Sequence, residues 1–283
     1  MATSWQKGQK GCFSGQRLHA DTSLNLPKKS IQHLLRPSAD YPGQDPLDEL
    51  YKEVLKGYFT HPAARLLFRS VVGQLIATFE PLSIHSLTTL RQHTSSDEDD
   101  DNAVVEMLRH LGSLLSNVNS ADESLPVVPL HTSFRDFLTN KEKSGDFFVS
   151  LRDAHRQLTH SSLGLLLKDL KFNVCNLESS YLANRDVKDL NSRIDKHIPP
   201  ALLYACRFWH DHLEHIDFET DLFVKIGSFF EKKLLFWLEA LSLTSNVGLA
   251  PAACSALNVW LARGLASGQC VSMIVDSTRK ANN

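Results

Sequence analysis

A series of helical patterns runs from His131 towards the end of this 283-residue chain. Apolar residues recur every three or four positions in each pattern, so each segment would bury one face as a helix. The strongest pattern begins at Pro199 and Pro200, which would fix the first helical turn. Because amphipathic helices with short connections must pack against one another, residues 141–265 are predicted to form a helical bundle.

The N-terminal part divides into a lead-in and a helical segment. Residues 1–43 are rich in Gly, Ser, Lys and Gln and end in a Pro-Gly turn, which predicts a poorly ordered lead-in. Residues 44–80 are predicted to hold two helices, which would begin at Pro46 and Pro62. At the other end, residues 266–283 are expected to be a tail.

Residues 81–140 have the element order of a winged helix. A short helix capped by Ser83 and a second helix over 102–115 are followed by two short strands, predicted at 116–119 and 127–130. The loop between the strands would be the wing. The predicted fold class is therefore mainly α, with a small winged helix and its β wing followed by a helical bundle.

An acidic segment, residues 94–101 (TSSDEDDD), lies between the two helices of the predicted winged helix. It is interpreted as a solvated loop, with a cation site or a phosphorylated serine patch as alternatives. A winged helix also raises the alternative of a nucleic-acid-binding protein. The charges argue against it, because 30 basic and 32 acidic residues give a net charge of −2 and five consecutive acids precede the second helix.

The sequence offers no anchor for catalysis. The glycines near the N-terminus lack the Gly-Lys-Ser/Thr of a P-loop, and a G-x-S-x-G or H-E-x-x-H motif is missing. We therefore expect no enzyme activity. The weaker alternative is a metal-dependent enzyme that uses His210, His212 and His215, because His212 and His215 would share a helical face. The competing interpretation is that these histidines favour a helix C-terminus, so we expect no metal ligand.

The chain is expected to be cytoplasmic and not associated with a membrane. Its first twenty residues lack the apolar core of a secretory signal, and no apolar run approaches the roughly 20 residues that a bilayer requires. The five cysteines are widely spaced and are interpreted as reduced thiols. A mitochondrial address from the basic N-terminus is an alternative, although it lacks an apolar face.

Three strings can be compared with known families by their residues and not only by their periodicity: LDELYKEVL (47–55), LHTSFRDFLTN (130–140) and the long block at 172–213. With FWLEALSL at 236–243, they resemble fungal NACHT proteins, which often carry C-terminal WD repeats. The resemblance covers residues 44–265. It implies an NLR-like signalling ATPase with an effector, a NACHT module, a winged helix, a helical linker and a sensor array. ATP or ADP with Mg would be the cofactor of intact members.

This chain departs from the family pattern, because the P-loop, the Mg-binding acids and the WD repeats are missing. The resemblance therefore implies a regulatory and linker portion, truncated or a fragment, whose partners are NACHT or WD-repeat modules or an intact relative. In the family a winged-helix histidine reaches the phosphate of bound ADP, and His131 in LHTSFRDFL matches it. The alternative is that His131 only begins a helix, partly packed beside Thr132 and Ser133.

Overall fold

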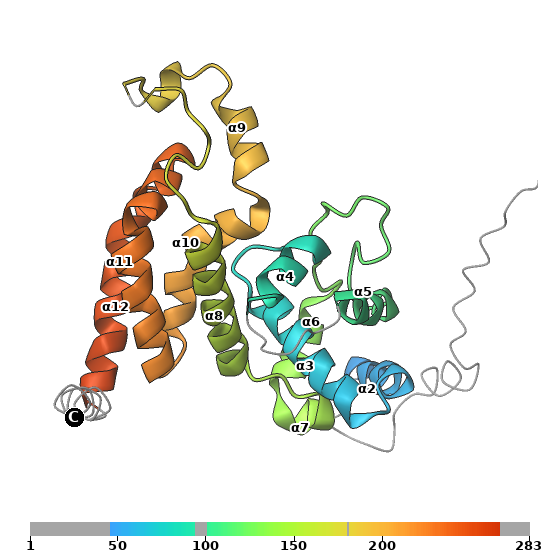
Figure 1. Ribbon diagram of the computed structural model, residues 1–283. Helices are drawn as coiled ribbons and strands as arrows, with labels where there is room; N and C mark the ends of the chain where they lie inside the picture. Colours follow the sequence, from blue (N-terminus) through green and yellow to red (C-terminus); the bar gives the residue numbers. More distant parts are fainter. Residues whose placement is uncertain (1–45, 94–100, 180, 267–283) are drawn as a thin grey trace, which may run out of the picture. The chain divides into compact units, whose positions relative to one another are not determined.

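The computed structural model describes residues 46–93, 101–179 and 181–266 (Figure 1). These residues form eleven α-helices and two short 3-10 turns, which confirms the mainly α class. The helices are α2 (Pro46–Tyr58), α3 (Pro62–Ala77), α4 (Ile84–Arg91), α5 (Asp101–His110), α6 (Thr132–Thr139), α7 (Lys141–Ser144), α8 (Leu151–Asp169), α9 (Leu190–His197), α10 (Pro200–Glu214), α11 (Thr220–Leu243) and α12 (Leu249–Ala266); the 3-10 turns are η1 (Gly145–Phe147) and η2 (Asn184–Asp186).

Three predictions fall mainly on residues outside the described part of the chain. The lead-in of residues 1–43 lies wholly outside it, and so does the acidic segment apart from its last residue, Asp101, which begins α5. The predicted tail lies outside it except for Ala266, the last residue of α12. Among the described helices, none is both long and apolar enough to cross a bilayer.

Several helices begin where the sequence predicts. Ser83 caps α4 through its side-chain oxygen, which accepts the Ser86 N–H. Pro62 and Pro200 occupy the first turns of α3 and α10. His61, which the sequence did not single out, caps α3 by accepting the Ala63 N–H on Nδ1.

The β wing of the predicted winged helix does not form among the described residues. Helix α5 ends at His110 instead of residue 115, and two isolated bridges replace the strands predicted at 116–119 and 127–130. The bridges pair Ser83 with Pro126 and Leu115 with Pro129. Proline has no N–H to give to a strand ladder, and Asn117 turns the chain with a φ of 60°. These two features limit the pairing to single contacts.

The segments that would have formed the wing nevertheless lie beside one another. The Ser116 N–H donates to Val128 O at 2.8 Å, and the Leu130 N–H donates to Leu114 O at 2.9 Å. On the other side the Val127 N–H donates to Leu82 O at 2.9 Å. Residues 126–130 therefore lie between 82–83 and 114–116, in an arrangement that resembles a sheet of minimal extent.

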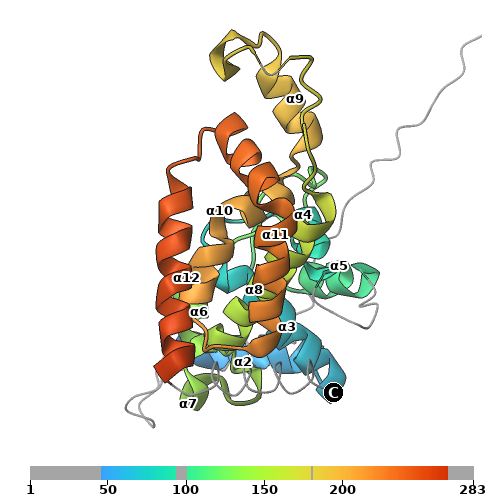
Figure 2. The same ribbon diagram turned by 60° about the vertical axis from the view of Figure 1, so that its left-hand side comes forward.

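The described part has two hydrophobic clusters. The N-terminal cluster comes from α2 to α6, their connecting segments and η1, and includes Phe68, Leu108 and Phe134, all almost completely buried. The C-terminal cluster comes mainly from α8 and α10 to α12 and is built around Trp209, Trp237 and Trp260. Helices α8, α10, α11 and α12 form the predicted bundle (Figure 2). Helix α9 has no buried residue and adds little to this core.

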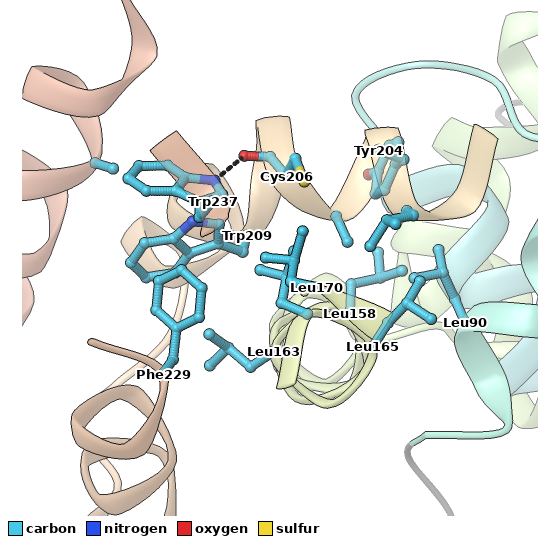
Figure 3. Packing of buried hydrophobic residues seen from close by; sticks show 14 of the residues in the cluster. Leu90, Leu158, Leu163, Leu165, Leu170, Tyr204, Cys206, Trp209, Phe229 and Trp237 are labelled. Atoms are coloured by element: carbon cyan, nitrogen blue, oxygen red, sulfur yellow. Dashed lines mark hydrogen bonds between the residues drawn. The ribbon is translucent and has the colours of Figure 1, made fainter. Parts of the chain in front are cut away.

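Aromatic rings fill the centre of the C-terminal cluster (Figure 3). The Trp237 indole lies edge-on to Trp209 at 6.1 Å and donates its N–H to Cys206 O at 2.9 Å. Phe229 lies against both indoles. The aromatic residues of α11 thus form part of the core, with the Trp237 indole N–H satisfied as a buried polar group must be.

Candidate functional site

Helix α8 lies between the two clusters, in contact with α3 and α4 on one side and with α10 and α11 on the other (Figures 1 and 2). We call the contact of α3, α4 and the segment after α3 with α8 and α10 the junction. Its core is apolar where Leu90 of α4 meets Leu158 and Leu165 of α8 (Figure 3). Two buried polar networks and one ion pair accompany this apolar contact.

The first polar network surrounds Arg91 at the end of α4, which is only 4% exposed. Its Nη1 donates to Ser70 Oγ at 3.0 Å and to Gln74 Oε1 at 3.1 Å, both on α3. Ser70 Oγ and Gln74 Nε2 in turn donate to Gln157 Oε1 on α8, at 3.1 and 3.0 Å. Because a buried guanidinium is costly unless it is hydrogen-bonded, the network fixes how the three helices meet.

The second network is a line of hydrogen bonds through two histidines. Nδ1 of His155 on α8 lies 2.7 Å from Nδ1 of His212 on α10, and Nε2 of His212 lies 2.7 Å from the Tyr204 hydroxyl. The same hydroxyl accepts the Phe79 N–H at 3.2 Å. One of the two Nδ1 atoms must carry a proton and the other a lone pair. The line therefore connects the end of α3 to α10 and then to α8.

Aromatic contacts surround these histidines. The Phe79 ring lies 4.8 Å from His212 and 5.8 Å from Phe208, measured between ring centroids. His215 stacks on His155 at 4.3 Å. His212 and His215 both contact His155 and Phe79, which confirms that they share one helical face.

Burial keeps His155 and His212 neutral by lowering their pKa values. It lowers the pKa of His212 well below the ordinary value, with a smaller contribution from His155. Burial, with help from His215 and Arg135, also lowers the pKa of His155 to about 4. The pKa of Tyr204 is raised, again mainly by burial, so its hydroxyl keeps its proton. At neutral pH the network consists of uncharged hydrogen-bonding groups.

An ion pair closes the edge of the junction. Arg207 of α10 donates from Nη1 to Glu80 Oε2 at 2.6 Å, and its guanidinium lies 4.8 Å from the centroid of the Phe208 ring. Glu80 lies three residues after the end of α3 at Ala77, and Phe208 contacts Phe79. The segment after α3 is therefore held at three points: the Phe79 N–H, the Phe79 ring and the Glu80 carboxylate.

His131 begins a helix, as the second interpretation of this residue predicts, but its side chain is exposed instead of partly packed. Nδ1 accepts the Ser133 N–H at 3.1 Å and lies 2.7 Å from Ser133 Oγ. Ser133 Oγ also lies 2.8 Å from the Tyr51 hydroxyl of α2. Because Nδ1 accepts, a neutral His131 carries its proton on Nε2. The structure thus gives His131 one exposed N–H donor.

Two of the histidines considered as metal ligands, His210 and His212, contact other side chains of the protein. Both ring nitrogens of His212 are engaged, by His155 and Tyr204. His210 is buried with Nδ1 3.5 Å from Asp211, edge-on to Trp209. Within the described ranges, no group of three or more His, Cys, Asp or Glu residues is placed to hold a metal ion.

The sequence placed His212 and His215 on one face but did not identify the junction. His155 and Phe79 lie outside the strings that carry the resemblance, and the two hydrogen-bonded histidines are 57 residues apart. The only signal was the position of His155 beside the apolar stripe of its helix, a place where a polar side chain is buried only if it has a partner.

A curated protein from the fungus Podospora anserina, vegetative incompatibility protein HET-E-1, is similar to this chain. The two are 26% identical over 243 residues, which cover 78% of this chain and 17% of that protein. The similarity supports the resemblance to NACHT-containing NLR-like proteins at the level of a distant relative. This chain thus spans about a sixth of the length of the relative it matches. No family model matches the sequence, and no solved structure matches it.

Proposed function

We propose that this chain is a non-catalytic regulatory and linker portion of a NACHT-type NLR-like protein, acting in the cytoplasm through packing between domains. The observation that carries the proposal is the junction, because two hydrophobic clusters are joined by polar networks that hold α3, α4, α8 and α10 in one arrangement. Networks of this kind specify a geometry more than they add stability. The similarity to HET-E-1 supports the class of protein.

Residues 81–140, from α4 to α6, would act as a winged-helix-like module in this proposal. The support is the order of its helices and the position of residues 126–130 between 82–83 and 114–116. In this module His131 would sense the phosphate of a nucleotide bound to a partner NACHT module. The exposed Nε2 donor and the fixed ring orientation of His131 fit that role.

Binding to a NACHT module tests the proposal. The chain is titrated with a separately purified NACHT module of a related fungal protein, loaded with ADP or with a non-hydrolysable ATP analogue, by isothermal titration calorimetry. We expect tighter binding to the ADP form, and we expect His131→Ala to remove the difference between the nucleotides. His85→Ala, a substitution at another exposed histidine, is the matched control. Failure to bind either form, or binding that ignores the nucleotide, would contradict the proposal.

A second measurement concerns catalysis. The chain by itself is expected to release no phosphate from ATP above the buffer rate in the presence of Mg. Turnover that copurifies with the chain through two different columns would show that the non-catalytic assignment is wrong.

A further inference from the structure

A hollow between α2, α3 and the α7–η1 turn collects positive charge away from the junction. Its volume is about 500 Å³. The charged residues that line it are Lys52, Lys56, Arg65, Lys143, Glu142 and Asp146. We call this hollow the basic pocket. Four cations against two carboxylates leave a lining charge of +2, although the whole chain has a net charge of −2.

One wall of the basic pocket is rigid. Arg65 Nε donates to Phe59 O at 2.9 Å and Nη2 donates to Thr60 O at 3.0 Å, so the guanidinium is held in one orientation. Its remaining nitrogen, Nη1, pairs with Asp146 Oδ2 at 2.5 Å. Phe147, which is 2% exposed, lies beneath the guanidinium. A fixed guanidinium is a good partner for a bidentate anion.

The opposite wall is a helix face with two lysines one turn apart. Lys52 pairs with Glu49 at 2.7 Å inside α2, and Lys56 has no carboxylate within pairing distance among the described residues. Lys143 pairs with Asp48 at 2.8 Å. Exposed ion pairs contribute little, so an incoming anion can compete with Glu49 for Lys52, whereas Asp48 is buried and holds Lys143 in place.

The mouth of the pocket is open at Gly145. Its φ is +55°, a conformation that other residues rarely adopt, and a Cβ built there would meet nothing within 4 Å. The turn into η1 therefore leaves space next to Arg65 and Asp146. Asp146 is 73% exposed at its side chain and can leave Arg65 without being buried elsewhere.

We propose that the basic pocket binds a small polyanion that carries phosphoryl groups. A phosphoryl group can take the place of Asp146 on Arg65, while Lys52 and Lys56 approach it from α2. Such groups satisfy guanidinium and ammonium donors with several oxygens at once. The ligand can be free in solution or be the headgroup of a phospholipid. The proposal is independent of the proposed function and of His131, which does not line this pocket.

Titration with inorganic pyrophosphate tests the proposal, followed by amide chemical shifts of the ¹⁵N-labelled full chain. We expect saturable shifts at residues 145–147 and a dissociation constant that Lys52→Glu/Lys56→Glu raises at least tenfold. Lys52→Arg/Lys56→Arg is expected to keep the binding. Thermal unfolding without ligand shows whether each variant is folded. If the Glu variant does not fold, loss of pyrophosphate binding by a folded Arg variant still contradicts the proposal.

The matched control is Lys171→Glu/Lys196→Glu, which changes the net charge equally at two exposed lysines outside the pocket. The proposal would be overturned if the control variant raised the dissociation constant for pyrophosphate as much as Lys52→Glu/Lys56→Glu does. It would also be overturned if the shifts did not saturate at millimolar pyrophosphate. Phosphatidylcholine vesicles with and without phosphatidylinositol bisphosphate distinguish the sources. If the chain sediments with the phosphoinositide vesicles and pyrophosphate reverses this, the ligand is a lipid headgroup. If the chain binds pyrophosphate but does not sediment with the vesicles, the ligand is a free polyanion.

Discussion

His155 and His212 share a single proton between two buried nitrogens 2.7 Å apart, and this contact sets the chemistry of the junction. His215 after α10 and Arg135 of α6 act on His155, and Asp211 and Glu80 act on the neighbouring Tyr204. Every group that shifts the pKa of His155 or His212 lowers it. Lowering the pH should therefore destabilise the folded junction.

The pH dependence of stability follows from His155. Its pKa is about 4 in the folded protein and near the ordinary 6.5 in the unfolded chain, so between these values the unfolded chain binds more protons. The contribution of His155 is complete above pH 6.5 and is lost as the pH falls to about 4. We expect a loss of about 1–3 kcal/mol in the free energy of unfolding from this histidine, measured by urea denaturation at a series of pH values.

His155→Gln is expected to flatten this part of the pH profile, because glutamine does not titrate. It should also lower stability at pH 7 by about 1–3 kcal/mol, since the Nδ1 atom of His212 loses a well-placed partner. His85→Gln is the control, an exposed histidine whose side chain makes no hydrogen bond in the described structure. An unchanged slope in His155→Gln would show that the acid sensitivity arises elsewhere.

At the scale of elements, helices were predictable and the wing was not. Proline and capping residues mark the starts of α3, α4 and α10, and apolar spacing marks their buried faces, so local sequence carries the information. Residues 127–130 (VVPL) have the apolar content of a strand, whereas residues 116–119 (SNVN) contain a single apolar residue, Val118. Pro126, Pro129 and the left-handed Asn117 cut the pairing to bridges, a result decided by backbone hydrogen bonding between distant segments.

Gly164 shows how closely α8 approaches the end of α4. A Cβ at this position would lie 2.9 Å from His93 Cβ and 3.2 Å from His93 O, atoms that cannot swing away. We therefore expect Gly164→Ala to destabilise the protein by about 1–3 kcal/mol through overpacking, although alanine favours a helix. Urea denaturation gives the value.

Gly227→Ala is the matched control on α11. A Cβ there would meet nothing within 4 Å, so the substitution should stabilise the protein by up to about 1 kcal/mol through helix propensity alone. Opposite signs for the two variants would locate the effect in the packing of α8 on α4. A stabilising effect of Gly164→Ala would mean that these two helices separate easily.

For the whole molecule, the bundle could be predicted from sequence, but the candidate site could not. The apolar spacing of α8, α10 and α11 predicts that they pack, because each must bury its stripe. The junction depends on partners distant in the sequence: Arg91 finds Gln74 17 residues away, and His155 finds His212 57 residues away. Only the folded chain brings such groups together, so no spacing rule identifies them.

The junction predicts that the two clusters unfold together. Trp209, Trp237 and Trp260 all lie in the C-terminal cluster, so tryptophan fluorescence of a Trp5→Phe variant reports that cluster, while far-UV circular dichroism reports every helix. We expect the two signals to give the same urea midpoint, because α8 is shared and the polar networks tie α3 and α4 to it.

Weakening the junction should separate the two signals. In Gln157→Leu the amide that joins α8 to Ser70 and Gln74 is lost and the buried Gln74 keeps an unpaired donor, so the N-terminal helices should unfold at a lower urea concentration than the tryptophan cluster. Gln92→Leu, which removes an exposed amide outside the junction, is the control and should leave the midpoints coincident. Two separate midpoints in the unmodified chain would contradict the mechanical coupling on which the proposed regulatory function depends, since clusters that unfold independently cannot transmit a change in packing from one to the other.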